Sequence, residues 1–246
     1  MGSRPLFHSL KIKGLGINKF ERLLHNRGLT AVVSKKRIVT TDGLHEDSDE
    51  NLTNGLIVRN INEVIAGDIT YFKSKAKLFY IFTLKDAYSK RVVGLYGSDN
   101  MMAINAIKTL KQVIYLRKKV NLVNTIHHSD AGSQYKSKMY KKVLKNCKMR
   151  MSIAENCLQN GMAEQLNGVL KNDYLINEKI KTVTQLNNAL KKVKKLINEE
   201  RPVAELGYKT PVAFEEWIAT LAPEVRSEII LHDFSQKLDE QKKGAL

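Results

Sequence analysis

The chain has 246 residues, with 41 Lys and Arg against 25 Asp and Glu, and its formal net charge is +16. This length is enough for one sizeable domain with its own core plus a smaller unit. The basic excess indicates a polyanion as partner, with nucleic acid the first expectation and a merely soluble basic protein the alternative. No run of 18 apolar residues exists and the two cysteines match no zinc-ligand spacing, which excludes a membrane-spanning protein and a zinc finger. Two thiols in a chain of this size fit a reducing, cytoplasmic compartment.

Residues 1–45 are expected to form a small basic helical segment. Asn18 is the expected N-cap of a helix, Glu21 follows three residues later, and Gly28 is expected to end the helix. The segment is either an ordinary helix packed on its neighbours or a helix-turn-helix-like unit that binds DNA. In the second interpretation the DNA-binding side chains are Arg22, Lys35, Lys36 and Arg37. Residues 46–55 are polar and aperiodic, which predicts a linker.

The main domain is predicted over residues 56–216. Three β-rich runs, VIAGDITYF, LFYIFTLKDAYS and RVVGLYGS, are joined by short polar connections, which is typical of a meander. A helix over 100–119 is expected next, and after it a strand that ends at Asp130. A short helix near 137–146, a strand MRMSI and a helix from Gly161 follow. Three strands followed by alternating helices and strands predict an α/β domain with a mixed sheet.

A further amphipathic helix is expected to begin at Thr184 and to end before Pro202. Its inward residues are Leu186, Leu190, Val193 and Ile197. Residues 217–246 are expected to form a last short helix beginning at Pro223 and a polar tail.

Three acids lie where phosphate chemistry would use them. Asp68 lies inside a β-rich run, where a carboxylate is costly unless something binds it, and Asp130 lies where the next strand ends. Glu164 lies on the predicted helix, and Gly168 and Lys171, four and seven residues further on, share its face. Mg²⁺ prefers oxygen ligands, and two such ions can stabilise the attacking and leaving oxygens of a phosphodiester. Taken singly, each acid can also be a turn residue or a solvated charge.

At these residues the chain resembles a known family. The core resembles the retroviral-integrase-type catalytic domain of bacterial insertion-sequence transposases, and more narrowly the second-frame product of elements whose transposase is encoded in two overlapping frames. About two thirds of the chain is covered by the matching segments, which are DITYF (68–72), DAYSKRVVG (86–94), HHSDAGSQY (127–135), NGMAEQLNGVLKND (160–173) and RP…LGYKTPVAF (201–214).

The resemblance implies an RNase-H-like fold, the integrase catalytic core, in which a mixed sheet is flanked by helices and preceded by a small helical segment. It implies that Asp68, Asp130 and Glu164 are both the catalytic residues and the ligands of Mg²⁺ or Mn²⁺, with two ions expected. The implied reaction is cleavage at the ends of an insertion element and attack of a 3′-hydroxyl on target DNA. The implied partners are double-stranded DNA, further copies of the chain and a first-frame DNA-binding protein, in the bacterial cytoplasm at the nucleoid.

Three more residues gain a role from the resemblance. Lys171 is expected to touch DNA near the cut, and Asn160 and Gln165 to orient substrate or water. A nuclease on the same fold and a DNA-binding remnant without catalysis are the alternatives to a transposase.

The chain also departs from its relatives. Ile65 stands where they commonly have tryptophan, and Val203 where they have histidine. Only 33 residues separate Asp130 from Glu164, two fewer than is common, which places a deletion in the loop 155–160.

Overall fold

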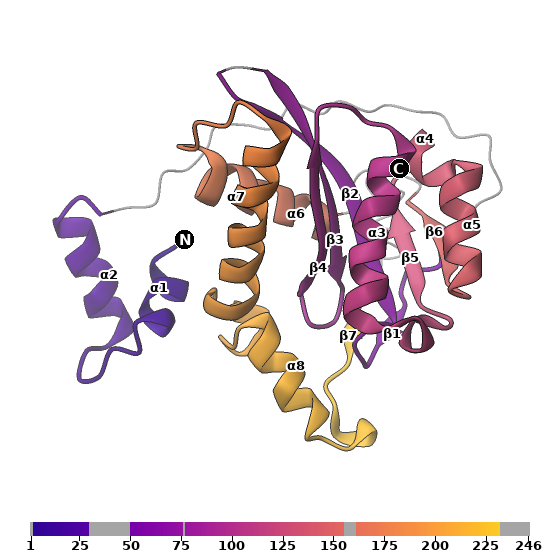
Figure 1. The fold of residues 1–246 in the computed structure, drawn as a ribbon. Coiled ribbons are helices and arrows are strands. Elements are labelled where there is room, and N and C mark those ends of the chain that lie inside the picture. The colour runs from indigo at the N-terminus through magenta and orange to yellow at the C-terminus, as the bar shows by residue number, and fades with distance from the viewer. Residues whose placement is uncertain (1, 30–49, 76, 155–160, 232–246) are drawn as a thin grey trace, which may run out of the picture.

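One mixed sheet of five strands organises the molecule. The structure, a computed structural model, describes residues 2–29, 50–75, 77–154 and 161–231 (Figure 1). Its strands are β1 (Ile57–Val58), β2 (Val64–Lys73), β3 (Leu78–Asp86), β4 (Val92–Ser98), β5 (Ile126–Ser129), β6 (Arg150–Ile153) and β7 (Ile229–Ile230). In the large sheet the order is β4-β3-β2-β5-β6. β2, β3 and β4 are antiparallel, whereas β5 pairs in parallel with both β2 and β6, so the predicted mixed sheet is confirmed.

Helices connect and cover these strands. They are α1 (Ser3–Ser9), α2 (Ile17–Asn26), α3 (Ala103–Arg117), α4 (Ser133–Lys136), α5 (Lys138–Asn146), α6 (Gly161–Val169), α7 (Val183–Lys195) and α8 (Pro211–Ala219). Two π-helical turns, Leu170–Leu175 and Leu196–Glu200, continue α6 and α7. The predicted helix at Pro223 is a single 3₁₀ turn, Pro223–Val225.

Two details of the helix ends differ from the sequence prediction. The expected Asn18 cap is wrong, because α2 begins at Ile17 with Gly16 as its N-cap, whereas Gly28 adopts a positive φ of 67° just beyond the helix. α7 begins one residue before Thr184, because the Thr182 hydroxyl and the Gln185 side chain form a reciprocal capping box.

The two faces of the sheet bury different sets of helices. On one face, apolar residues of β2, β3 and β4 pack with α3 and α5, and Ile65 lies fully buried in this cluster. The isoleucine therefore fills a packed position in the core. On the other face, Phe79 and Ile81 pack with leucines of α6 and α7. Figure 1 shows α3 and α5 on one side of the strands and α6 and α7 on the other.

A glycine in β4 allows the close approach of α7. A Cβ built at Gly97 would lie 2.3 Å from Leu186 Cδ2, so any side chain there would push the helix away. The Asn187 side chain then bonds the Gly97 backbone, accepting from its N–H at 3.0 Å and donating to its carbonyl at 2.8 Å. These contacts fix α7, which in turn supports α6.

A buried group of charges fixes α8 to the sheet. Asp86, at the end of β3, is fully buried and accepts hydrogen bonds from the backbone N–H groups of Tyr88 and Ser89 at 3.0 and 2.9 Å. Arg117 at the end of α3 lies 3.5 Å from Asp86 and binds Glu215 of α8 with both of its terminal nitrogens. Burial raises the pKa of Asp86, and Arg117 opposes that rise.

The first and last described strands of the core meet. β1 and β7 form a two-stranded antiparallel pair in which Ile57 lies opposite Ile230. Two flanking backbone bonds, Gly55 N–H to Leu231 O at 3.0 Å and Leu231 N–H to Leu56 O at 2.9 Å, extend the pair. No helix within the described ranges is long and apolar enough to cross a membrane.

Candidate active site

Asp68 lies in the middle of β2, on the face that α6 covers. Alternation along the strand puts Ala66, Asp68 and Thr70 on this face, and Thr83 of β3 lies directly opposite Asp68. Asp68 Oδ1 accepts a hydrogen bond from the Ile69 N–H at 2.8 Å. The carboxylate is half-buried, which leaves one side of it open to solvent.

Asp130 comes to Asp68 through parallel strand pairing. Gly67 lies opposite Ser129, so the residue after β5 emerges beside Asp68. Asp130 Oδ1 also accepts a hydrogen bond from the Gly132 N–H at 3.2 Å, so the side chain has the turn role that its sequence context predicts. The turn fixes the carboxylate at the edge where the parallel strand ends.

Glu164 lies in the first turn of α6, and the helix places a polar face on the sheet. Burial raises the pKa of Asp68 to about 7, and repulsion from Asp130 and, more weakly, from Glu164 adds to the rise. The Ile69 N–H and the Lys171 ammonium oppose it. The three acids therefore share one electrostatic environment, although no three acid, histidine or cysteine groups among the described residues already lie close enough to hold a metal ion.

Asn167 is a site residue that the sequence did not single out. It is buried, and its Nδ2 donates to Asp68 Oδ2 at 2.5 Å. Its own Oδ1 lies 3.5 Å from the Thr83 hydroxyl, which also donates to the Asp68 carbonyl at 3.2 Å. Gly168 was predicted to share the helix face of Glu164 and Lys171, and a Cβ built there would meet nothing within 4 Å, so this part of the helix is not packed on the sheet. Asn167, three residues after Glu164, therefore faces the sheet at this point, and Gly168, four residues after Glu164, does not.

Lys171 lies in the π-helical turn after α6. Its Nζ donates to Thr70 Oγ1 at 3.0 Å and lies 5.3 Å from the centre of the Tyr71 ring. Both partners belong to β2, two and three residues beyond Asp68. The ammonium is thus held next to the acids, where it lowers the pKa of Asp68.

Gln165 is exposed and connects α6 to a buried lysine. Its Oε1 accepts from Lys85 Nζ at 3.3 Å. Lys85 lies on β3 on the same face as Asp68, is 6% exposed, and has no ion-paired carboxylate in the described part of the chain. Burial lowers the pKa of Lys85 to about 8, with repulsion from Lys90 adding to the effect and Glu205 opposing it.

The remaining predicted site residues lie elsewhere. Arg22 is exposed on α2, which packs with α1 and lies apart from α6 (Figure 1). Asn160, Lys35, Lys36 and Arg37 lie outside the described residues, as does the shortened loop 155–160. The structure thus brings Asp68, Asp130, Glu164, Lys171 and Gln165 to one region and leaves Arg22 outside it.

His127 has a packing role on the opposite face. Its Nε2 lies 2.7 Å from the Tyr140 hydroxyl of α5, and its ring packs against Tyr135. Complete burial lowers the pKa of His127 to about 3, which keeps the imidazole neutral. The histidine supports the α5 side of the core.

Comparison with known proteins identifies one recurring domain. Two sequence models, both described as the integrase core domain, match residues 59–156 and 145–211, which together span more than half of the chain. Transposase InsF for insertion sequence IS3A of Escherichia coli K12 is 29% identical over 197 residues, covering 76% of this chain and 68% of that protein. A Mycobacterium tuberculosis protein assigned to insertion sequence element IS986/IS6110 is 26% identical over 186 residues. That match covers 71% of this chain and 66% of the mycobacterial protein, just under two thirds of its length.

A solved structure confirms the fold class. The HTLV-2 integrase catalytic core domain, determined in complex with magnesium in a dimeric form, superposes with a TM-score of 0.51 at 21% identity. The match covers 66% of this chain and 99% of the viral one. The predicted RNase-H-like sheet with flanking helices is therefore confirmed.

Proposed function

The chain belongs to the integrase core family, and from this premise we propose that it is a DNA transposase of the Asp-Asp-Glu type. The observation that carries the proposal is the convergence of Asp68, Asp130 and Glu164 from β2, the end of β5 and α6. Like charges gathered on an open face are unfavourable in the isolated fold, so the site is suited to a cationic ligand.

The three carboxylates fit a divalent metal. They offer only oxygen ligands, which Mg²⁺ and Mn²⁺ prefer, and their mutual repulsion is what a bound cation removes. Asp68, Asp130 and Glu164 would hold the metal, with two ions as the expected number. When bound, the metal would supply charge stabilisation to the attacking and leaving oxygens of a phosphodiester. The magnesium in the HTLV-2 integrase core supports this assignment.

The chain's own residues would orient the reaction. Asn167 and the Ile69 N–H hold the Asp68 carboxylate in one rotamer, and Lys171 places a positive charge where a DNA phosphate would lie. In strand transfer, the 3′-hydroxyl oxygen of an element end forms a bond to a target phosphorus. The attacking hydroxyl gives up its proton, the bond from that phosphorus to the target's 3′ oxygen breaks, and the released oxygen takes up a proton.

The proposed partners follow from this reaction. The substrates would be the double-stranded ends of the element and a target duplex. Because two ends must be joined to one target, at least two copies of the chain would act together, and a separate first-frame protein would supply further DNA binding. The predicted segments are 1–45, 46–55, 56–216 and 217–246. Because α8 crosses the boundary at 216 and β7 pairs with β1, the proposed core extends to residue 231.

Joining of labelled, pre-cut ends tests the function. The substrate is a duplex bearing the terminal sequence of the element that encodes the chain, incubated with a target duplex and Mn²⁺ or Mg²⁺. We expect joined product with the natural chain and only background with Asp68→Asn, Asp130→Asn or Glu164→Gln, because each substitution removes one anionic ligand. Each variant should still fold and should retain DNA nearly as well as the natural chain.

Asp99→Asn is the matched control, since Asp99 is an exposed acid that pairs with Lys77 away from the site. Full activity in any of the three site variants would remove that residue from the site. Cutting without joining would support a nuclease on the same fold. A chain that folds and binds DNA but neither cuts nor joins with either metal would be a DNA-binding remnant.

A further inference from the structure

A dense run of positive charge follows Asp130 and is not used by the proposed chemistry. Between Asp130 and Glu155 the chain has seven lysines and arginines and no acid. Six of them are exposed, on α5 and the residues after it, namely Lys138, Lys141, Lys142, Lys145, Lys148 and Arg150. We call this set the lysine ridge.

Helical phase puts the ridge on the outer face of α5. The inner face is formed by Tyr140, Leu144 and, just beyond the helix, Cys147, all of which are buried against the α3 side of the sheet. Lysines at three- and four-residue steps are neighbours on a helix surface, and like charges at this spacing destabilise the helix. Within the described residues, no carboxylate pairs with Lys138, Lys142, Lys145, Lys148 or Arg150. The fold therefore keeps a self-repelling row that a polyanion would relieve.

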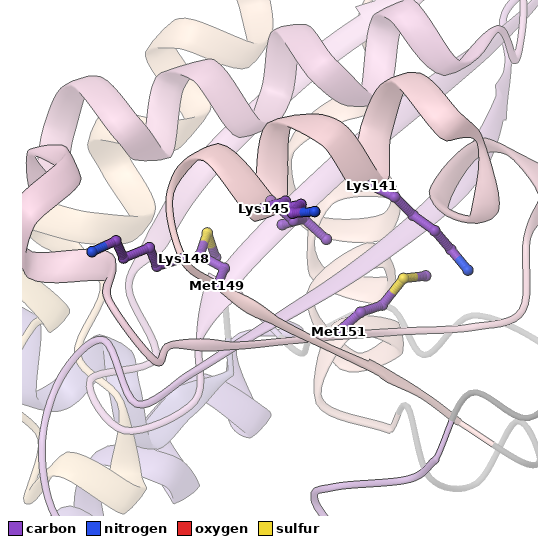
Figure 2. A pocket seen from close by; sticks show the side chains of 6 residues that line it. Lys141, Lys145, Lys148, Met149 and Met151 are labelled. Atoms are coloured by element: carbon purple, nitrogen blue, oxygen red, sulfur yellow. The ribbon is translucent and has the colours of Figure 1, made fainter.

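The ridge borders a groove beside β6. The groove has a volume of about 510 Å³ and is lined by Lys141, Leu144, Lys145, Lys148, Met149 and Met151. Figure 2 shows Met149 and Met151 below α5, with Lys141 and Lys145 on the helix and Lys148 beside Met149 beyond its end. Its floor is apolar and its rim is cationic.

We propose that the lysine ridge is a second DNA-binding surface, which holds a duplex by its phosphate backbone outside the acid site. The nine residues of α5, Lys138–Asn146, rise about 13 Å, the length of about four base pairs. Lysine is a point charge that suits phosphates without base readout, and the methionine floor fits the apolar faces of the sugars. DNA as the ligand rests on the proposed function.

The position of the ridge suggests which DNA it holds. Asp130 lies at the end of β5, near the other acids, and the ridge begins eight residues later at Lys138. From there it follows α5, which lies on the face of the sheet opposite α6. A duplex entering the acid site would lie along α6 and Lys171. The ridge instead leads along α5 to Lys148, whose carbonyl accepts from the Asn124 N–H just before β5 begins, at the end of β5 opposite Asp130. It therefore holds a flanking stretch of the duplex and adds affinity without taking part in bond making.

Salt dependence of DNA binding tests the proposal. The full chain, the ridge variant Lys141→Gln/Lys145→Gln/Lys148→Gln and a control variant Lys191→Gln/Lys192→Gln/Lys195→Gln bind a labelled 30-base-pair duplex between 50 and 300 mM NaCl. Both variants lose the same net charge, and the control lysines lie exposed on α7, on the other face of the sheet. Each lost phosphate contact lowers the slope of log affinity against log salt by about 0.9, so the ridge variant should lose about 2.7 and weaken at least about tenfold at 100 mM.

The control should lose less than about one unit of slope. Equal losses in the two variants would mean a general charge effect and would overturn the proposal, as would an unchanged slope in the ridge variant. Loss of self-association or of acidic-peptide binding with DNA binding intact would overturn it in favour of a protein partner. Lys141→Arg/Lys145→Arg/Lys148→Arg should retain the natural slope, and melting curves show that each variant is folded.

Strand joining measured in parallel separates this proposal from the proposed function. If the natural chain does not join ends but the salt slope of DNA binding falls in the ridge variant, the DNA surface stands and the transposase function is refuted. If the natural chain joins ends but the salt slope is unchanged in the ridge variant, the transposase function stands and the DNA surface is refuted.

Discussion

Asp68→Asn should stabilise the metal-free protein while it abolishes strand joining. The pKa of Asp68 rises from 3.8 to about 7 in the fold, because burial and the neighbouring acids disfavour its charged form. A shift of about three units, at 1.36 kcal/mol per unit, corresponds to about 4 kcal/mol of stability lost above pH 7. Because one side of the carboxylate faces solvent, we expect the variant to gain about 2–4 kcal/mol, or about 5–15 °C in melting temperature. Asparagine keeps an acceptor for the Ile69 N–H, and the Asn167 amide can invert to present its oxygen.

The sign of the pH dependence follows from the direction of the shift. Below about pH 4 the carboxyl is protonated in both the folded and the unfolded chain, so Asp68 costs nothing there. As the pH rises from 4 to 7 the unfolded chain ionises first, and the natural protein loses stability relative to the variant. The gap should therefore open between pH 4 and 7 and stay constant above it.

Thermal and urea unfolding in EDTA, from pH 4 to 8, measure this gap. Asp99→Asn is the control, because the hydrogen bond from Lys77 lowers the pKa of Asp99, and its removal should not stabilise the chain. Added Mn²⁺ should raise the melting temperature of the natural protein and not that of Asp68→Asn. A variant less stable than the natural chain at pH 8 in EDTA, or a gap that does not change with pH, would refute the reasoning.

Three further outcomes are expected. Lys85→Met should raise the free energy of unfolding at pH 7 by up to about 3 kcal/mol, because the pKa of Lys85 falls from 10.5 to about 8 on folding. This gain in stability should shrink as the pH rises from 8 to 10.5. Urea unfolding at pH 7 and at pH 9.5 measures the difference. Arg117→Met leaves Asp86 buried without its cation and leaves Glu215 with Arg91 as its remaining ion-pair partner. The change should cost about 3–5 kcal/mol in urea unfolding, so a cost below 1 kcal/mol would contradict the role of this group. Lys171→Ala should reduce strand joining more than DNA affinity, and equal losses in the two assays would make Lys171 a general phosphate contact.

Composition and periodicity predicted most of the elements. The apolar runs of β2, β3 and β4 are rich in β-branched and aromatic residues, and α7 carries the inward leucines that its spacing predicted. Local patterns were sufficient for these elements because each one buries a face whose apolar residues recur at regular spacing within its own sequence. The prediction of Asn18 as the N-cap was wrong because glycine is also a favoured N-cap residue, and Gly16 takes this position two residues earlier.

The polar interior was less accessible from sequence. Asn167 is three residues from Glu164, and only the phase of α6 against the sheet decides that it, and not Gly168, meets Asp68. Lys85 lies in an ordinary β-rich run, and its partner Gln165 is 80 residues away. Arg117 and Glu215 are 98 residues apart. Such pairs follow from the tertiary packing of helices on the sheet, which no local pattern encodes.

The pairing of β1 with β7 brings the first and last described segments of the core together. Residues 55 and 231 lie side by side at one end of an antiparallel pair, about 5 Å apart, so a short linker could join them. New termini could then be opened in the exposed turn between β2 and β3, giving a circular permutant with the same acid site. Force applied between residues 55 and 231 would instead open the β1–β7 pair one hydrogen bond at a time, starting from the end at which these two residues meet.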